Sequence, residues 1–204
     1  MATRTVHGEP KSLNEAINHL EYGKQWEAAV LEEYQSLIKN DTWTVVELPE
    51  GRSPISCKWV FHLKFDSDGN IVRFKVRLVG RGFSQVYGID YLETFAPVAK
   101  LTSVRILFAI GSVEDLEIHQ IDFITAFLGG ELEEEIYMEM PEGFVEYSVN
   151  GERLVCKLGK AIYGLKQSAR IWNHKLFKVL KKLGFQQLAS DNCFGSMMKL
   201  VSLW

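Results

Sequence analysis

Residues 58–83 read KWVFHLKFDSDGNIVRFKVRLVGRGF, and this stretch predicts a β-hairpin. Two runs of alternating apolar and polar residues flank Asp68-Gly69, a dipeptide typical of the two-residue type I′ turn. With Asp68 and Gly69 as the loop, one face of the hairpin is apolar, as a buried face requires. The apolar cross-strand pairs are Leu63 with Phe74, Phe61 with Val76, and Trp59 with Leu78.

The other face of this hairpin is basic. Like charges that lie directly opposite one another destabilise a sheet, so these side chains either spread into solvent or meet an anion. The pattern alone fits a solvated surface and a phosphate-binding surface equally well. The cross-strand pairs on this face are Lys64 with Arg73, His62 with Lys75, and Val60 with Arg77.

The remaining periodicities predict an α+β chain in which antiparallel hairpins pack against helices. Apolar residues spaced by three and four predict amphipathic helices at 24–40 and 168–183. Ser12 and Glu15 form a predicted capping box ahead of the first helix, and Gly184 fits the C′ position of the second. Strands are predicted at 43–48, 116–123, 135–140 and 153–158, with a further helix at 102–110 capped by Thr102.

Composition indicates an intracellular protein, cytoplasmic or nuclear. The 204 residues are 47% hydrophobic, enough to bury a core, and no apolar run approaches the roughly 18 residues of a membrane span. No secretory signal is visible, and the three cysteines form no Cys-x-x-Cys pair, which favours a reducing compartment. Because the net charge is −3, binding to nucleic acid would depend on uneven placement of charge.

The stretch HQIDFITAFLGG, residues 119–130, sets the single carboxylate of Asp122 among apolar neighbours. Burying an ionised carboxylate without a partner is costly, so this side chain needs a partner or a path to water. One explanation is a helix N-cap, because Asp favours the position just before a helix. The other is a metal ligand, because hard cations such as magnesium prefer oxygen.

Three long strings occur in a specific order: RFKVRLVGRGFSQVYGIDYLETFAPVAKLTSVR at 73–105, HQIDFITAFLGGELEEEIYMEMPEGF at 119–144 and VCKLGKAIYGLKQSARIW at 155–172. Together they closely resemble the reverse transcriptase of copia-type (pseudovirus-type) LTR retrotransposons, part of the Pol polyprotein. The resemblance covers residues 12–194 and leaves 195–204 as a divergent tail. It implies the fingers and partial palm of a right-handed polymerase, in which two magnesium ions support addition of deoxynucleotides to a primer on an RNA or DNA template.

The same resemblance assigns functional residues. Asp122 matches the first metal-binding, catalytic aspartate of the family. Phe127 matches the bulky residue beneath the sugar, which excludes a ribose 2′-hydroxyl, and Gln167 matches a glutamine near the 3′ side of the nucleotide. Taken singly, Phe127 fits a core residue, Gln167 a surface residue and Asp122 a cap. The nucleotide-binding residues implied are Lys75 and Arg77 at the triphosphate, with Phe123, Phe127 and Gln167.

One part of the family pattern is missing from these residues. The family completes its metal site with a Tyr-x-Asp-Asp turn, and the sequence contains no adjacent aspartates, although Asp191 fits the family's aspartate ahead of the strand leading to that turn. We therefore expect a catalytically incomplete fragment whose apolar strand faces are exposed. The alternatives are a non-catalytic remnant that binds nucleic acid or nucleotide through the basic hairpin, and a structural remnant without activity. The sequence does not decide the oligomeric state or whether these residues form an enzyme.

Overall fold

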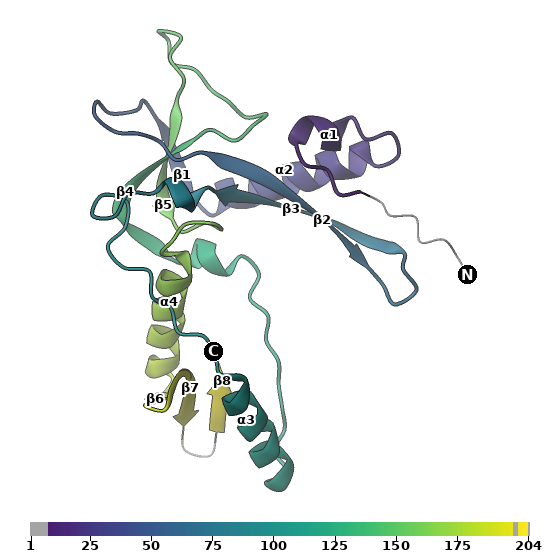
Figure 1. The fold of residues 1–204 in the computed structure, drawn as a ribbon, viewed down its shortest axis with the longest axis vertical. Helices are drawn as coiled ribbons and strands as arrows, with labels where there is room; N and C mark the ends of the chain where they lie inside the picture. Colours follow the sequence, from purple (N-terminus) through teal and green to yellow (C-terminus); the bar gives the residue numbers. More distant parts are fainter. Residues whose placement is uncertain (1–7, 198–199, 204) are drawn as a thin grey trace.

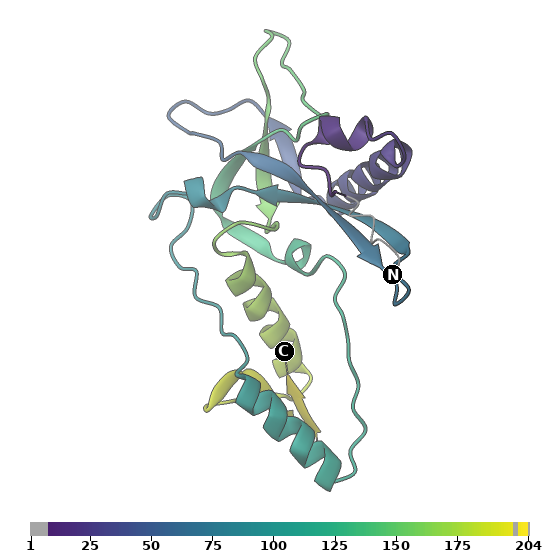
Figure 2. The same cartoon turned by 45° about the vertical axis from the view of Figure 1, so that its right-hand side comes forward.

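The computed structural model describes residues 8–197 and 200–203, and it divides them between a body and an arm (Figure 1). Helices and antiparallel sheets are mixed throughout, so the predicted α+β class is confirmed. The arm extends from the body along α4, as a second view shows (Figure 2). The body contains α1 (Leu13–Ile17), α2 (Gly23–Lys39), β1 (Trp43–Val46), β2 (Cys57–Phe65), β3 (Ile71–Gly80), η1 (Gly82–Ser84), η2 (Ala126–Gly129), β4 (Glu131–Glu139) and β5 (Val155–Lys160). The arm contains α3 (Leu101–Val113), α4 (Ser168–Lys182), β6 (Gln186–Leu188), β7 (Asp191–Met197) and β8 (Leu200–Leu203).

The hairpin β2–β3 has the predicted register at all six predicted pairs, from Trp59 with Leu78 to Lys64 with Arg73. Its loop, however, is not the predicted two-residue turn. Asp66 and Asn70 close a three-residue loop, and Gly69 alone of these takes a positive φ, of 87°. The Asp66 carboxylate accepts hydrogen bonds from the backbone of Asp68 and Asn70 at 3.0 and 2.8 Å, which stabilises the longer loop. A bulge at Val72 then restores the register.

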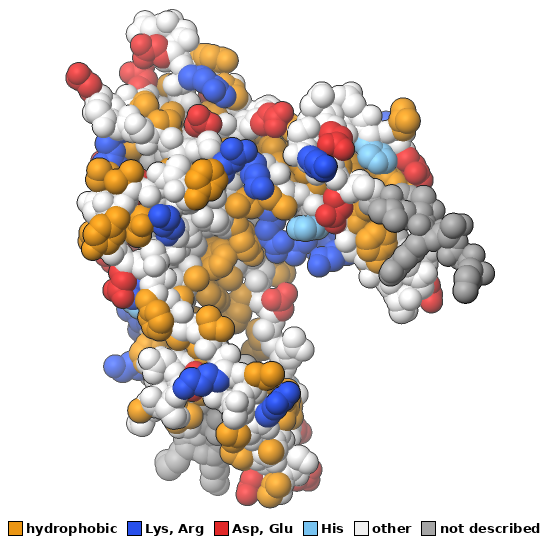
Figure 3. All heavy atoms as spheres, in the orientation of Figure 1, with side chains coloured by type: hydrophobic (Ala, Val, Ile, Leu, Met, Phe, Trp, Pro, Cys, Tyr) orange, Lys and Arg blue, Asp and Glu red, His pale blue; other side chains and the backbone are white. Residues whose placement is uncertain are grey.

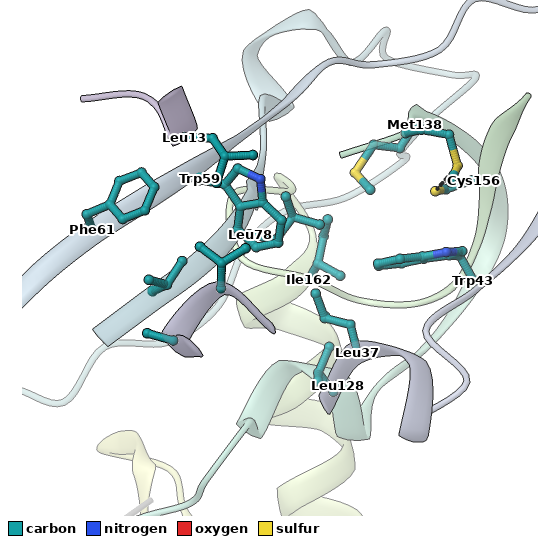
Figure 4. Packing of buried hydrophobic residues seen from close by; sticks show 14 of the residues in the cluster. Leu13, Leu37, Trp43, Trp59, Phe61, Leu78, Leu128, Met138, Cys156 and Ile162 are labelled. Carbon is teal, nitrogen blue, oxygen red and sulfur yellow. Dashed lines mark hydrogen bonds between the residues drawn. The ribbon is translucent and has the colours of Figure 1, made fainter. Parts of the chain in front are cut away.

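The apolar face of the hairpin packs against α2, which begins and ends within a residue of its predicted bounds. Trp26 of α2 is almost fully buried, and its ring meets those of Phe61 and Phe74 edge to face, with centroids 5.4 and 4.8 Å apart. Edge-to-face aromatic pairs of this kind stabilise a core beyond the area that they bury. The same core continues past Leu78 and Ile162 to Cys156 and Met138 in the second sheet (Figure 4).

The second sheet, ordered β1-β5-β4, is joined to the hairpin through Ile55. The Ile55 backbone donates to the Tyr137 carbonyl and accepts from Glu139, both at 2.8 Å. The predicted strands near 43–48, 135–140 and 153–158 are therefore confirmed, with shifted ends. The predicted capping box at Ser12 is confirmed in part, since the Ser12 hydroxyl accepts from Glu15 N, while the Glu15 carboxylate binds Lys11 N.

Each outer edge of the hairpin is covered at one point by a carboxylate. Glu9 accepts a hydrogen bond from Leu63 N at 2.9 Å on the β2 side, and Glu33 of α2 accepts from Leu78 N at 3.3 Å on the β3 side. Burial raises the pKa of the Glu33 carboxyl, although the Leu78 hydrogen bond opposes this. Backbone donors that would otherwise be open to another strand are thus occupied.

The arm holds α3 against the small sheet β6-β7-β8 through Asp191, the first residue of β7. The Asp191 carboxylate accepts from Lys100 N at 3.1 Å, from the Ser103 hydroxyl at 2.7 Å and from Cys193 N at 3.0 Å. The prediction that Thr102 caps this helix was wrong, because α3 begins at Leu101 and Asp191 supplies the cap from another element. Helix α4 and the positive φ of Gly184 agree with prediction.

The strand predicted at 116–123 does not form. The chain from 116 to 123 is extended between turns at 114–115 and 124–125, but it pairs with no strand in the described parts of the molecule (Figures 1 and 2). Alternating apolar residues make a strand only when a neighbour accepts their hydrogen bonds, and none lies here. Ile118, Ile121 and Ile124 are consequently exposed, as expected for an apolar segment without a partner.

The predicted divergent tail at 195–204 falls at the end of the small sheet. It contains the last residues of β7 and all of β8, which pair in antiparallel fashion from Phe194 with Leu203 to Met197 with Leu200. Positions 198, 199 and 204 of that tail, and positions 1–7 in the region searched for a signal, lie outside the described residues. Within the described part of the chain, none of the helices has the length and hydropathy needed to span a bilayer.

Candidate functional site

A hollow lies between the hairpin β2–β3 and the arm (Figure 3). Hydrophobic side chains gather on its floor, and basic side chains gather where the hairpin borders it. The figure therefore shows a concave surface with a cationic margin, the shape and charge that suit an anionic ligand with an apolar part.

The basic margin contains Lys75 and Arg77 on the solvent-facing side of β3, and both are half-buried. Partial burial lowers the pKa of the Lys75 ammonium, and the neighbouring Arg77 and Lys64 lower it further. Asp122 acts in the opposite direction, so its carboxylate lies within electrostatic reach of Lys75. An arriving phosphate would relieve the repulsion among these cations.

Asp122 itself is exposed and lies in the extended chain just before η2. The sequence predicted that Asp122 ends a strand or caps the helix that follows. In the structure it lies outside the described strands, and the N-cap of η2 is Thr125, with a φ of 55°. Both predicted positions for this side chain were therefore wrong, although the short helix that was expected to follow it is present. What the structure retains is the proximity of Asp122 to the basic margin.

Phe123 and Phe127 pack on different aromatic partners. The ring of Phe123 meets that of Trp172 on α4 at 5.0 Å, and the ring of Phe127 on η2 meets that of Tyr163 at 4.7 Å. The guanidinium of Arg77 lies over the same Tyr163 ring at 4.6 Å. Arg77 and Phe127, two of the predicted nucleotide-binding residues, are thus brought together by a third residue.

Taken singly, the residue type of Gln167 indicated a surface position. In the structure Gln167 is buried, with only 1% of it exposed. Its amide nitrogen donates to the Asp90 carbonyl at 2.8 Å, and its amide oxygen accepts from the Gln85 side chain at 3.1 Å. Gln85 in turn accepts from Lys166 N at 2.8 Å. These bonds fasten the loop that follows β3 to the beginning of α4, and the Gln167 amide is engaged in them.

The connection between β5 and α4 approaches the end of β3 so closely that only glycine fits. A Cβ at Gly164, whose φ is 91°, would collide with the Gly80 carbonyl and lie 2.6 Å from Cγ1 of Val79. Gly80 N donates to the Tyr163 carbonyl at 2.8 Å, and Gly82 N donates to the Gly164 carbonyl at 3.2 Å. The backbone of Tyr163 is therefore held firmly against β3.

The donors present do not make a metal site of the expected kind. Asp122 is one carboxylate, and among the described residues no group of three or more His, Cys, Asp or Glu side chains is placed to hold a metal ion. A pair of magnesium ions needs several oxygen ligands. The structure thus brings Arg77 and Phe127 together on Tyr163 and places Asp122 within electrostatic reach of Lys75, but the described residues do not supply a complete set of metal ligands.

Sequence reasoning missed Tyr163 and Gln85. Both belong to long-range contacts, so hydrophobic periodicity gave no signal for them. The only local signal was Gly164 beside Tyr163, since an isolated glycine often marks a close approach of the backbone.

Comparison with known sequences defines the class of this protein. A sequence model of the family described as "Reverse transcriptase (RNA-dependent DNA polymerase)" matches residues 40–199. Because that range covers most of the chain, the chain belongs to this family. The copia-type resemblance drawn from the three strings is confirmed by the relatives that follow.

The chain is 50% identical over 186 residues to the "Retrovirus-related Pol polyprotein from transposon TNT 1-94" of Nicotiana tabacum. It is 39% identical over 187 residues to the "Retrovirus-related Pol polyprotein from transposon RE1" of Arabidopsis thaliana. Each match covers 91% of this chain but only 14% and 12% of the respective relative. The chain is thus a reverse transcriptase-like domain of the kind found in retrotransposon Pol polyproteins. No solved structure matches it.

Proposed function

We propose that residues 12–194 form the nucleotide-facing and template-facing part of a reverse transcriptase, corresponding to the fingers and part of the palm. The proposal is carried by the basic face of the hairpin, where Lys75 lies within electrostatic reach of Asp122 and Arg77 shares the Tyr163 ring with Phe127. Family membership supports the same assignment. The partners are an RNA or DNA template with its primer, and deoxynucleotides.

In this proposal the cations of the hairpin neutralise phosphate groups. Arg77 offers planar N–H donors that suit phosphate oxygens, and Lys75 offers a mobile point charge. The Phe127 ring provides the apolar surface on which a sugar rests. Gln167 acts indirectly, because its amide already holds the loop at Gln85 and Asp90 in place.

Catalysis in the family depends on divalent metal, and magnesium would polarise the reacting phosphate oxygens when bound. Asp122 supplies one carboxylate toward such a site, and these 204 residues contain no adjacent aspartates to complete it. We therefore propose that the isolated residues bind template and nucleotide but do not extend a primer. The activity of any longer polyprotein is a separate matter.

Binding of a labelled RNA–DNA hybrid to the isolated chain tests this function. Lys75→Ala and Arg77→Ala should each weaken binding across all sequences and lower the salt slope by about one. The matched controls are Lys178→Ala and Lys181→Ala on α4, each of which removes one positive charge away from the hairpin and should leave the slope nearly unchanged. Absence of binding at low salt, or equal losses in the control, would refute the proposal.

Primer extension with magnesium and deoxynucleotides tests the catalytic part. We expect no extension by the isolated chain. Extension that disappears in Asp122→Asn would show that the residues present complete a metal site after all.

A further inference from the structure

Tyr163 connects two parts of the site that come from different elements. One face of its ring carries the Arg77 guanidinium of β3 at 4.6 Å. The Phe127 ring of η2 meets it at 4.7 Å with an interplanar angle of 72°. A single half-buried ring thus contacts both a phosphate-binding candidate and the sugar-binding candidate.

The ring can act as a fixed support because its backbone cannot shift independently of β3. The Tyr163 carbonyl accepts from Gly80 N at 2.8 Å, and the next residue, Gly164, has no room for a side chain against Gly80. Arg77 lies three residues before Gly80 on the same strand. The distance between the guanidinium and the ring is therefore determined by a rigid backbone contact.

The contact with the Tyr163 ring also determines which atoms of Arg77 remain available to bind a ligand. Within the described part of the chain, no carboxylate lies within ion-pair distance of Arg77. A guanidinium packed flat on an aromatic ring keeps its N–H groups in the plane, directed outward from the ring. Tyr163 thus holds a cation that no ion pair neutralises, although the Glu33 carboxylate of α2 lies within electrostatic reach of it.

We propose that Tyr163 is a positioning residue that sets the spacing between Arg77 and Phe127, and thereby couples triphosphate binding to recognition of the sugar. The proposal rests on the proposed function, since it assumes that Arg77 meets phosphate and Phe127 meets the sugar. Removing the ring should release the Arg77 guanidinium and let Phe127 relax into the vacated space. One substitution would then weaken both interactions.

Calorimetric titration of the 204-residue chain with three probes tests the coupling. Tripolyphosphate reports on the hairpin cations, Arg77 among them, without a sugar, while dGTP and GTP differ only in the 2′-hydroxyl that Phe127 should exclude. We expect Tyr163→Leu to lower tripolyphosphate affinity about three- to fivefold, the range of one cation–π contact. We also expect it to reduce the preference for dGTP over GTP. Tyr163→Phe keeps the ring and should retain both properties.

The matched control is Tyr91→Leu, which removes a tyrosine ring whose cation–π partner is the Lys166 ammonium, at 4.5 Å, and not Arg77. It should change neither the tripolyphosphate affinity nor the sugar preference. If a folded Tyr163→Leu variant kept the wild-type affinity for tripolyphosphate, this inference would be overturned and the proposed function would stand. Failure of the wild-type chain to bind any of the three probes would overturn the proposed function and this inference with it.

A second measurement tests the inference even if the Tyr163→Leu variant does not fold. In the wild-type chain, the Nε–H proton of Arg77 should resonate upfield because of the Tyr163 ring current, with its assignment fixed by loss of the signal in Arg77→Lys. A signal at the ordinary position would show that the stacking does not persist in solution, and the inference would fall.

Discussion

Replacing Gly164 by alanine should destabilise the protein far more than the same change at Gly69. Both glycines have a similar positive φ, 91° and 87°, so an alanine pays a similar backbone penalty at each, about 1 to 2 kcal/mol. At Gly69 nothing lies within 4 Å of the added Cβ, and the cost should end there. The comparison therefore separates backbone strain from steric conflict.

At Gly164 the added Cβ would meet the Gly80 carbonyl and Val79. The connection between β5 and α4 can relieve this only by moving away from β3. That movement stretches two hydrogen bonds, Gly80 N to Tyr163 O at 2.8 Å and Gly82 N to Gly164 O at 3.2 Å. Each is worth about 1 kcal/mol, so Gly164→Ala should cost about 3 to 4 kcal/mol in total.

Urea unfolding followed by tryptophan fluorescence measures both variants, because Trp26 and Trp59 are buried and report on loss of the core. The difference between the two variants should be about 2 kcal/mol, from the two stretched hydrogen bonds. Equal free energies of unfolding for Gly164→Ala and Gly69→Ala would refute the reasoning, because they would show that the close approach to β3 contributes nothing.

Three further predictions concern titration, reactivity and the carboxylate of HQIDFITAFLGG. Hydrogen bonds from Ser103 and Cys193 N hold the pKa of Asp191 below its ordinary value, so its contribution to stability is complete above about pH 4 and disappears as the pH falls through the lowered pKa. The melting temperature should therefore fall less between pH 6 and pH 3 in Asp191→Asn than in the wild type, and parallel curves would contradict this. Burial raises the pKa of Cys57 to about 12, so mass mapping should find it unmodified by iodoacetamide at pH 8 in the folded chain and modified in urea; rapid labelling without urea would show that the thiol is accessible. Asp122→Asn should leave the unfolding midpoint unchanged because this side chain caps no helix, whereas loss of an N-cap costs about 1 kcal/mol and would be measurable.

The sequence predicted best those elements whose partners lie nearby in the chain. The register of β2–β3 followed from alternation alone, because a slip of one residue would bury Lys64 and expose Leu63. The turn was wrong because the Asp66 side chain, two residues before Asp68, supplied hydrogen bonds that the Asp-Gly signal does not include. Local pattern thus fixed the faces of the hairpin but not the geometry of its loop.

The sequence failed where an element depends on a distant partner. Residues 116–123 have the alternation of a strand but no neighbour to pair with among the described residues, and α3 is capped by Asp191 from another element. In the site, the resemblance selected Lys75, Arg77 and Phe127, but only the structure shows that Tyr163 joins the last two. Buried Gln167 is a similar case, because the Asp90 carbonyl and the Gln85 side chain that its amide binds lie more than 75 residues away.

The carboxylates of Glu9 and Glu33 at the two edges of the hairpin bear on how copies of this chain would associate. A strand from another molecule that added to β2 or β3 would have to displace a carboxylate from Leu63 N or Leu78 N and then lie beside its charge. In the extended segment 116–123, no carboxylate of the described residues covers a backbone donor in this way, and Ile118, Ile121 and the adjacent Ile124 are exposed. Self-association should therefore begin at that segment, and a charged residue in place of Ile121 should suppress it more effectively than any change on the hairpin.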